Sequence, residues 1–369
     1  LANCAGKNLD DFSGTIALNN FHMQSLDDYF SLDSIIISAT NTNDERVINV
    51  KSDFLTGEIK GNYQYSTIPQ SILRIMEHYL PSLLKEHVNY MPNNKFEVSA
   101  KLIDATPFVH MFNLPLELQE EITVEGKFND VDNIIQLDVA AGEFTYNEQH
   151  YELGKILCTN DGDTLHSTLD VNRTNGDKKV SFALEATAKD DNLLANISWD
   201  NNQASERFKG KVSTKAKFYQ DFNEPMGVNI SILPSNIILN DTTWQVRPGN
   251  IDYQNNKIRI SKLALENGSR HLIVNGTVGE EQTDTLKADL KEINLEYVFD
   301  ALNFHPVHFA GIATGKAIAN GLLSDIDFDA NLFIRNFQFE HGTLGNMNLH
   351  GNWNREEEGI YLNGHISEF

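Results

Sequence analysis

The sequence is poor in the residues on which many folds and most enzymatic sites depend. Only two of its 369 residues are cysteines, Cys4 and Cys158, so a disulfide scaffold is excluded. No apolar stretch approaches the roughly 20 residues that a membrane-spanning helix needs. No Gly-rich phosphate loop and no Gly-x-Ser-x-Gly elbow occurs, and Cys158 has no adjacent base. We therefore expect no enzymatic activity and no cofactor.

Positive charge is also scarce. The chain has 29 Lys and Arg residues against 52 Asp and Glu residues, which gives a formal net charge of −23. Nucleic-acid binding relies on Lys and Arg to neutralise phosphates, and adsorption to anionic membranes relies on a basic patch. The charge argues against both roles and favours solubility of a surface that would otherwise self-associate.

What the sequence does have is a repeated strand pattern. Six times it contains five residues in the order apolar, polar, Gly, polar, apolar. These Gly phrases are Ile59 to Tyr63, Val124 to Phe128, Phe208 to Val212, Val274 to Val278, Leu349 to Trp353 and Leu362 to Ile366. A period of two indicates a strand whose glycine falls on the apolar face. Glycine in that place favours curvature, or close approach by another backbone or a ligand.

Strict alternation extends well beyond these phrases. Residues 95–102, for example, place Phe96 and Val98 on one face and Lys95 and Glu97 on the other. Burial of one face only is typical of antiparallel sheets. We predict a mainly β protein, an elongated, repetitive and curved antiparallel sheet with an apolar groove. We expect residues 1–369 to form one such segment of a larger protein.

Helical pattern is limited to short amphipathic insertions near residues 67–90, 104–113 and 293–303, each directly after a strand. The first has an apolar stripe that includes Ile68, Ile75 and Tyr79. Thr67 is its predicted N-cap, and Pro81 should kink the helix or split it. A membrane-surface role is disfavoured because its polar face is not rich in Lys and Arg. We expect the helices to cap or plug the sheet.

Two clusters deserve consideration as metal sites. His341, His350 and His365 lie in neighbouring predicted strands, but His350 and His365 flank phrase glycines on the polar side, where solvent exposure is the better interpretation. Three alternate carboxylates share one strand face, namely those of Asp325, Asp327 and Asp329. Because no Gly-bearing calcium loop accompanies them, a charged outer face is favoured. We expect no metal site.

Three segments resemble one known family. They are residues 6–16 (GKNLDDFSGTI), residues 52–63 (SDFLTGEIKGNY) with the helix that follows, and residues 240–286. The closing run of residues 309–364, Gly-rich with alternating strands, has the same general character. In these segments the chain resembles the TamB proteins of the Gram-negative envelope, within the AsmA-like group. The resemblance implies a β-taco in the periplasm, in a protein anchored to the inner membrane by a segment outside this chain. It also implies a role in outer-membrane biogenesis, with no catalytic residues to carry over.

The leading hypothesis is a conduit whose groove binds phospholipid acyl chains between the two membranes. The candidate groove-lining residues are Ile59, Tyr63, Val124, Phe128, Phe208, Val212, Val274, Val278, Ile326, Phe328, Leu349, Trp353 and Leu362. The alternative is a scaffold or chaperone whose sheet edge pairs with outer-membrane barrel proteins during their assembly or secretion. A carbohydrate-binding β protein would need exposed aromatic residues, and three tryptophans are few.

Overall fold

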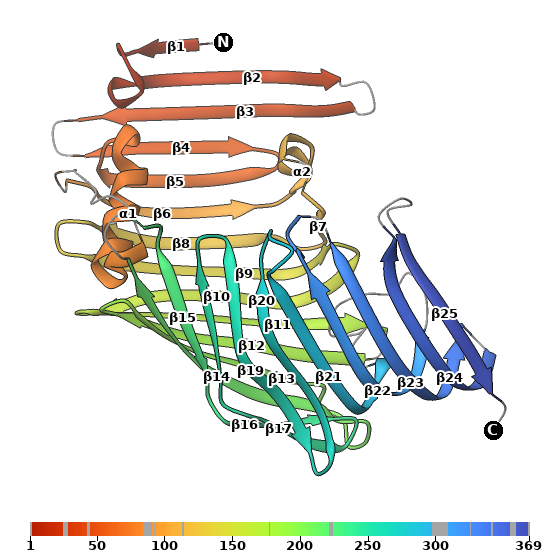
Figure 1. Ribbon diagram of the computed structural model, residues 1–369. Coiled ribbons are helices and arrows are strands. Elements are labelled where there is room, and N and C mark those ends of the chain that lie inside the picture. The colour runs from red at the N-terminus through yellow and green to blue at the C-terminus, as the bar shows by residue number, and fades with distance from the viewer. Residues whose placement is uncertain are drawn as a thin grey trace. The chain divides into compact units, whose positions relative to one another are not determined.

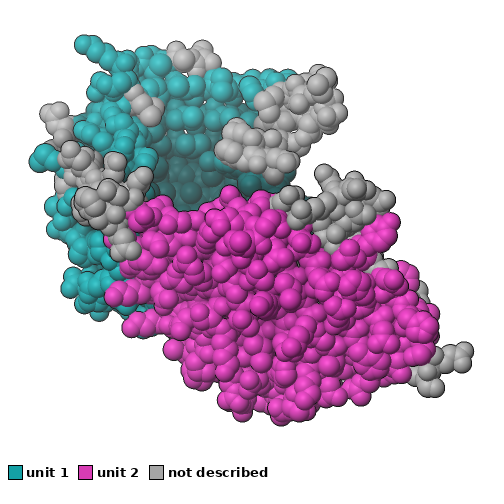
Figure 2. Space-filling view, in the orientation of Figure 1, with its two compact units in different colours: residues 1–202 teal, residues 203–369 magenta. Residues whose placement is uncertain are grey.

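The computed structural model describes residues 2–24, 29–42, 45–83, 91, 93–112, 114–176, 178–220, 224–296, 309–324, 326–340, 342–354 and 359–367. The chain divides into two compact units, Leu1–Asn202 (unit 1) and Gln203–Phe369 (unit 2), which are coloured separately in Figure 2. Strands account for 71% of the structure and helices for 8%. All paired strands are antiparallel, so the predicted mainly β, antiparallel fold is confirmed.

Unit 1 is a meander in which nearly every strand pairs with its neighbours in sequence (Figure 1). The exception is the short strand β7, which pairs with β9 beyond the end of β8. The strands are β1 (Ala2–Ala5), β2 (Ser13–Gln24), β3 (Tyr29–Asn41), β4 (Arg46–Ser52), β5 (Leu55–Asn62), β6 (Lys95–Leu102), β7 (Leu116–Leu118), β8 (Ile122–Asn129), β9 (Ile134–Tyr146), β10 (Gln149–Asp161), β11 (Thr164–Asn175), β12 (Lys178–Lys189) and β13 (Asn192–Asp200).

Unit 2 continues the same pattern from β19 to β25. Its strands are β14 (Phe208–Tyr219), β15 (Gly227–Ile232), β16 (Ser235–Leu239), β17 (Thr242–Val246), β18 (Gly249–Gln254), β19 (Lys257–Asn267), β20 (Arg270–Val278), β21 (Thr285–Asn294), β22 (Phe309–Asn320), β23 (Asp327–Phe339), β24 (Gly342–Asn354) and β25 (Gly359–Ser367). All six Gly phrases fall in strands, except that Tyr63 lies one residue beyond β5.

Two prolines break long strands of unit 2 into halves. β15 and β16 both pair antiparallel with β14, so they follow one line that is interrupted at Pro234. β17 and β18 likewise both pair with β19 and are interrupted at Pro248. Proline has no N–H to donate to the ladder, which explains both breaks. A Pro-Gly pair commonly marks a turn, so the sequence alone predicts one at Pro248-Gly249. The structure contradicts this prediction, because the chain continues in the same direction along β19.

The helices are short and follow strands, as predicted. Helix α1 (Ile68–Tyr79) is preceded by the 3₁₀ turn η2 (Tyr65–Thr67) and followed by η3 (Pro81–Leu83), so Pro81 splits the helical segment. Thr67 stands at the N-cap position, but its side chain makes no capping bond and instead donates to the Gln64 carbonyl. Helix α2 (Thr106–Phe112) lies within the second predicted segment. Residues 84–90 and most of the third predicted helix lie outside the described residues.

Two phrase glycines show why the phrase needs glycine. Gly61 has φ +151° and Gly276 has φ +126°, a region that side-chain-bearing residues rarely adopt. A Cβ at Gly61 would collide with the carbonyl of Lys95, and one at Gly276 with the carbonyl of Thr285. The close approach of a neighbouring backbone, one of the two explanations considered from the sequence, therefore applies at both positions.

Candidate apolar groove

One face of unit 1 carries unbroken rows of apolar side chains across the strands. In antiparallel sheets, directly opposed residues point to the same face. The central row runs through eleven strands as Ile16, Ile37, Val50, Gly57, Ala100, Val124, Val139, Ile156, Leu169, Leu184 and Ile197. Parallel to it lies a second row that includes Ala39, Ile48, Ile59, Val98 and Leu137. We call this surface the apolar face of unit 1.

The opposite face of the same strands is polar. Its central row reads Thr15, Ser38, Asn49, Glu58, Ser99, Glu125, Asp138, Leu157, Thr168, Glu185 and Asn196. Leu157 is its one apolar member. The period-two pattern of the sequence therefore corresponds to two chemically distinct faces, which is the arrangement that a one-sided groove requires.

The apolar face of unit 1 is not covered along its central row. No side chain in that row is fully buried, and Ile156 and Ile197 are 40% and 46% exposed. The chain has an accessible surface of 22247 Å². Two compact globules sharing its mass of 41.6 kDa would expose only about 18,000 Å². Figure 2 shows the face of unit 1 on which α1 lies, and that face is hollowed.

Helix α1 covers one margin of this face. Its buried residues Ile75 and Tyr79 are 1% and 0% exposed, and burial raises the pKa of the Tyr79 hydroxyl. Near the start of the helix, Tyr63 contacts Phe96, which stacks on Phe128 with ring centroids 5.1 Å apart. Two predicted groove residues, Tyr63 and Phe128, are consequently 1% and 7% exposed. They belong to the packed margin, whereas Ile59 and Val124 remain half-buried on the open part.

A carboxylate–amide cluster fastens α1 to the sheet. Asp130, in the β8–β9 turn, accepts hydrogen bonds from the Ser71 hydroxyl at 2.6 Å and from the Asn94 backbone N–H at 2.9 Å. All three residues are buried. The Asn94 amide in turn donates to the hydroxyls of Ser71 and Thr67. Sequence reasoning missed this cluster, because its members are far apart in the chain and no local pattern connects them.

Further carboxylates repeat the attachment along the helical segment. Asp163, in the β10–β11 turn, lies 3.7 Å from His78, and Asp191, in the β12–β13 turn, accepts from the Ser82 N–H at 2.7 Å. Ser71 and His78 are seven residues apart, or about 10.5 Å along a helix. Their two partner turns are two strands apart, or about 9.6 Å. The near match of these spacings lets α1 run across successive hairpins of unit 1.

A fourth attachment lies before the helix. The Asp10 carboxylate accepts hydrogen bonds from the hydroxyl of Ser66 at 2.5 Å and from its backbone N–H at 3.2 Å. The Ser66 hydroxyl, followed by the backbone donors, holds the pKa of Asp10 below its usual value. The contact ties η2 to η1 (Leu9–Asp11).

Unit 2 has an apolar face of the same kind. One row reads Ala216, Ile230, Ile251, Ile260, Gly276, Leu286, Ala319 and Phe328. Another reads Leu265, Leu272, Leu290, Gly315, Leu332, Leu349 and Gly364. Most of these side chains are half-buried. The predicted residues Val274 and Phe328 therefore lie on one continuous apolar face.

The remaining predicted residues of unit 2 differ in their surroundings. Leu349 packs against a buried cluster of Leu295, Ala313, Ile334 and Phe337. Val212, Val278 and Ile326 are half-buried, and Phe208 is 38% exposed at the start of β14. Trp353 and Leu362 lie in β24 and β25, but their side chains lie outside the described part of the structure.

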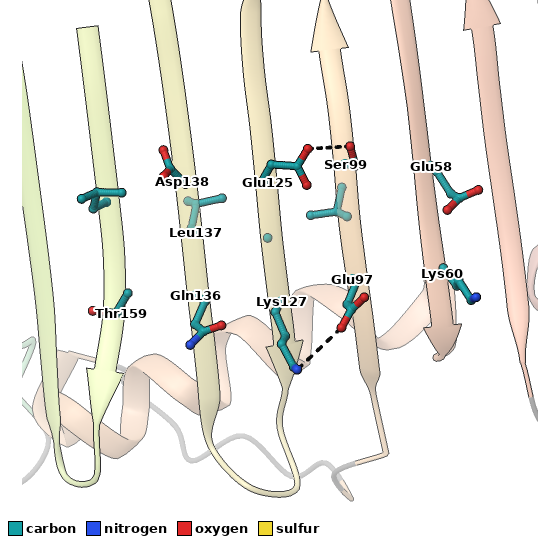
Figure 3. Close-up of a pocket in the computed structure, with 13 residues that line it drawn as sticks. Glu58, Lys60, Glu97, Ser99, Glu125, Lys127, Gln136, Leu137, Asp138 and Thr159 are labelled. Carbon is teal, nitrogen blue, oxygen red and sulfur yellow. Dashed lines mark hydrogen bonds and ion pairs between the residues drawn. The ribbon is translucent and has the colours of Figure 1, made fainter.

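The polar face of unit 1 has a shallow depression of about 450 Å³ (Figure 3). It is lined by charged side chains of β5, β6, β8 and β9, including Glu97 and Lys127, whose charged atoms are 3.6 Å apart. Ser99 donates to Glu125 at 2.7 Å. Each of these groups is exposed, and such pairs contribute little to stability or binding. The depression therefore has the character of a solvated charged surface.

The residues considered as metal ligands do not form a site in the described residues. The His350 Nδ1–H donates to the Asn331 Oδ1 at 2.9 Å, and the His350 Nε2 lies 3.7 Å from Asp329, on the polar face of β23 and β24. His365 is exposed. His341 and Asp325 lie outside the described residues. Within the described part of the chain, no group of three or more His, Cys, Asp or Glu side chains is positioned to hold a metal ion.

Comparisons with protein-family models, with curated proteins and with solved structures find no match to this chain. Among the helices that the structure describes, none is both long enough and apolar enough to cross a membrane. Cys4 is exposed, Cys158 is half-buried, and neither forms a disulfide.

Proposed function

We propose that the apolar faces of this protein bind lipid acyl chains and carry them along the sheet, as part of phospholipid transport between membranes. The observation that supports this proposal most directly is the central row of unit 1, which crosses eleven strands without a polar residue and without full burial. A monomeric protein rarely leaves a contiguous apolar surface of this extent exposed unless it binds something there.

The energetics favour movement over trapping. Each methylene removed from water contributes about 0.8 kcal/mol, so five methylenes lying on the apolar face gain about 4 kcal/mol. Successive strands are about 4.8 Å apart and present similar side chains, so neighbouring positions are nearly equal in energy. Such a ladder of equivalent sites lets a chain slide from one strand to the next.

The location belongs to the same proposal. The resemblance to TamB proteins supports a periplasmic segment of an inner-membrane-anchored protein that reaches toward the outer membrane. On this proposal the protein is not an enzyme, takes no cofactor and does not bind nucleic acid. Its partners are phospholipids, together with any outer-membrane protein recognised by other parts of the polypeptide.

The decisive experiment is photo-crosslinking in living cells with matched pairs of positions. A photoreactive residue at Phe328 samples the apolar face of unit 2, and one at Asp327 samples its polar face. Val139 and Asp138 form the same kind of pair in unit 1. We expect phospholipid adducts at Phe328 and Val139 and none at the two aspartates. Crosslinks only within the chain at both apolar positions would refute the groove.

An edge scaffold is the second candidate. Strand β25 pairs with β24 along Gly359 to Ser367 and has no other strand partner among the described residues. An unpaired edge can accept a strand of a client protein, such as an outer-membrane barrel protein. Prolines introduced into β25 would impair this function, whereas a charge at Phe328 would not. The groove function has the opposite sensitivity, so the two variants separate the candidates.

A further inference from the structure

The arginines that the structure describes on the strands and their connections differ according to the face on which they lie. The four on the polar surface are each paired with a carboxylate. The pairs are Arg207 with Asp241 at 2.7 Å, Arg247 with Glu266 at 2.6 Å, Arg259 with Asp252 at 3.6 Å and Arg335 with Glu292 at 2.9 Å. With 52 acidic residues in the chain, such pairing is what an exposed cation is expected to find.

Three arginines lie on the apolar faces instead. Arg46 is opposite Gly61, Arg173 is opposite Val180, and Arg270 is opposite Asn267. Among the described residues, no carboxylate lies within ion-pair distance of any of the three. Two of them have an aromatic neighbour: the Arg173 guanidinium carbon is 6.0 Å from the Phe182 ring centre, and that of Arg270 is 5.6 Å from the Trp244 ring centre.

The surroundings of Arg270 are the most fully built. One guanidinium nitrogen, Nη2, donates to the Asn267 side-chain oxygen at 2.7 Å, and the Trp244 ring lies against the cation. Trp244 is 4% exposed, and its Nε1–H is buried with no acceptor in the described structure. Arg270 itself is half-buried, at the end of the strand that carries Leu272 and Val274. The site thus has an oriented cation and an unsatisfied donor beside an apolar row.

Arg46 shows a related feature in unit 1. Its Nη1 is buried without an acceptor in the described residues. Arg46 is opposite Gly61, which has no side chain and is itself opposite Phe96, the ring that contacts Tyr63. A long arginine stem can cover apolar surface without any ligand. That reason alone does not explain why these three arginines have no carboxylate partner, whereas Arg207, Arg247, Arg259 and Arg335 each have one.

We infer that these arginines, with Arg270 and Trp244 as the principal site, bind the anionic head group of an amphiphile whose chain lies on the apolar face. A guanidinium presents five N–H donors in a planar fork that matches phosphate and carboxylate oxygens. Contact with an aromatic ring holds the cation in place. The inference rests on the proposed function and adds a class of ligand to it, since a purely apolar groove would not distinguish anionic from neutral amphiphiles.

The test compares three probes that separate the head group from the chain. Dodecyl phosphate has both parts, dodecyl maltoside has the chain with a neutral head, and inorganic phosphate has only the anion. Binding of each to the full chain is measured below its critical micelle concentration by isothermal titration calorimetry. We expect dodecyl phosphate to bind about tenfold more tightly than dodecyl maltoside, and inorganic phosphate not to compete at millimolar concentration.

Variants of Arg270 test whether this residue causes the difference in affinity between dodecyl phosphate and dodecyl maltoside. Arg270→Gln should abolish the preference for dodecyl phosphate while leaving dodecyl maltoside binding unchanged. Arg270→Lys should keep part of it, because the charge remains and the planar fork is lost. Arg259→Gln removes an arginine of the polar face and should change nothing. Arg173→Gln provides an independent test in unit 1 should the unit 2 variant fold poorly.

The outcomes distinguish this inference from the proposed function. Equal affinity for the two amphiphiles, unaffected by Arg270→Gln, would overturn the head-group site and leave the groove intact. Tight binding of inorganic phosphate alone would overturn it in favour of a site for a free anion. Failure of both amphiphiles to bind would overturn the groove itself.

Discussion

Removal of the Asp130 carboxylate should release helix α1 from the margin of the apolar face. Asp130 is 1% exposed and accepts hydrogen bonds from Ser71 at 2.6 Å and from the Asn94 backbone at 2.9 Å. A hydrogen bond to a charged group contributes about 1.5 kcal/mol or more. Asp130→Ala removes both bonds and leaves both donors buried without this acceptor. We therefore expect a loss of about 3 kcal/mol in the free energy of unfolding.

The assay is urea denaturation followed by circular dichroism, combined with hydrogen exchange of the amides of Ile68–Tyr79. Protection should fall first in α1, because the polar attachments that remain, at His78 and Ser82, are exposed or half-buried. Asp138→Ala is the matched control: this carboxylate lies 3.8 Å from Lys155, and both side chains are 50% exposed. Asp138→Ala should lower the free energy of unfolding by less than about 0.5 kcal/mol. An Asp130→Ala effect no larger than that of the control would refute the attachment of α1 through this cluster.

Three further predictions concern other parts of unit 1. Gly61→Ala should lower the free energy of unfolding, measured with urea, by about 2–3 kcal/mol, because a Cβ would collide with the backbone of β6. Gly162→Ala, in an open turn, should lower it by only about 1 kcal/mol. The pKa of Asp10 is lower in the folded protein than in the unfolded chain, so Asp10 stabilises the fold at pH values above its ordinary pKa. This stabilisation is lost as the pH falls through the pKa of the folded state. Asp10→Asn and Ser66→Ala should each make the melting temperature less dependent on pH in the acid range. Lys127→Met breaks only an exposed ion pair and should leave the melting temperature unchanged within 1–2 °C, roughly the error of such measurements.

Much of the fold follows from the sequence because the side-chain period of a strand is two. The alternation in residues 95–102 and the Gly phrases predicted strands, their two faces and the place of each glycine. Alternation does not describe the strands in which an extra residue changes the register. β19 contains such a bulge between Ile260 and Leu263, with Lys262 at φ +55°, and this keeps both apolar residues on one face. Strict alternation cannot anticipate an insertion of this kind.

The candidate groove was partly predictable for the same reason. Ile59, Val124, Val274 and Phe328 are apolar at alternate positions, and the structure places each on an apolar face. The burial of Tyr63 depends on a helix that crosses several hairpins, so it depends on contacts between residues far apart in sequence. Local pattern contains no information about such contacts.

The sequence by itself determined which side chains share a face, because alternation is a property of each strand alone. Only the tertiary structure decided which of those side chains stay open and which are packed, because that depends on where α1 and the buried clusters lie. The tertiary structure also decided which arginines have a carboxylate partner. Arg259 and Arg270 are eleven residues apart on neighbouring strands, yet one lies on the polar face within reach of Asp252 and the other lies against Trp244 on the apolar face. Strand register, which arises from long-range hydrogen bonding, sets that difference.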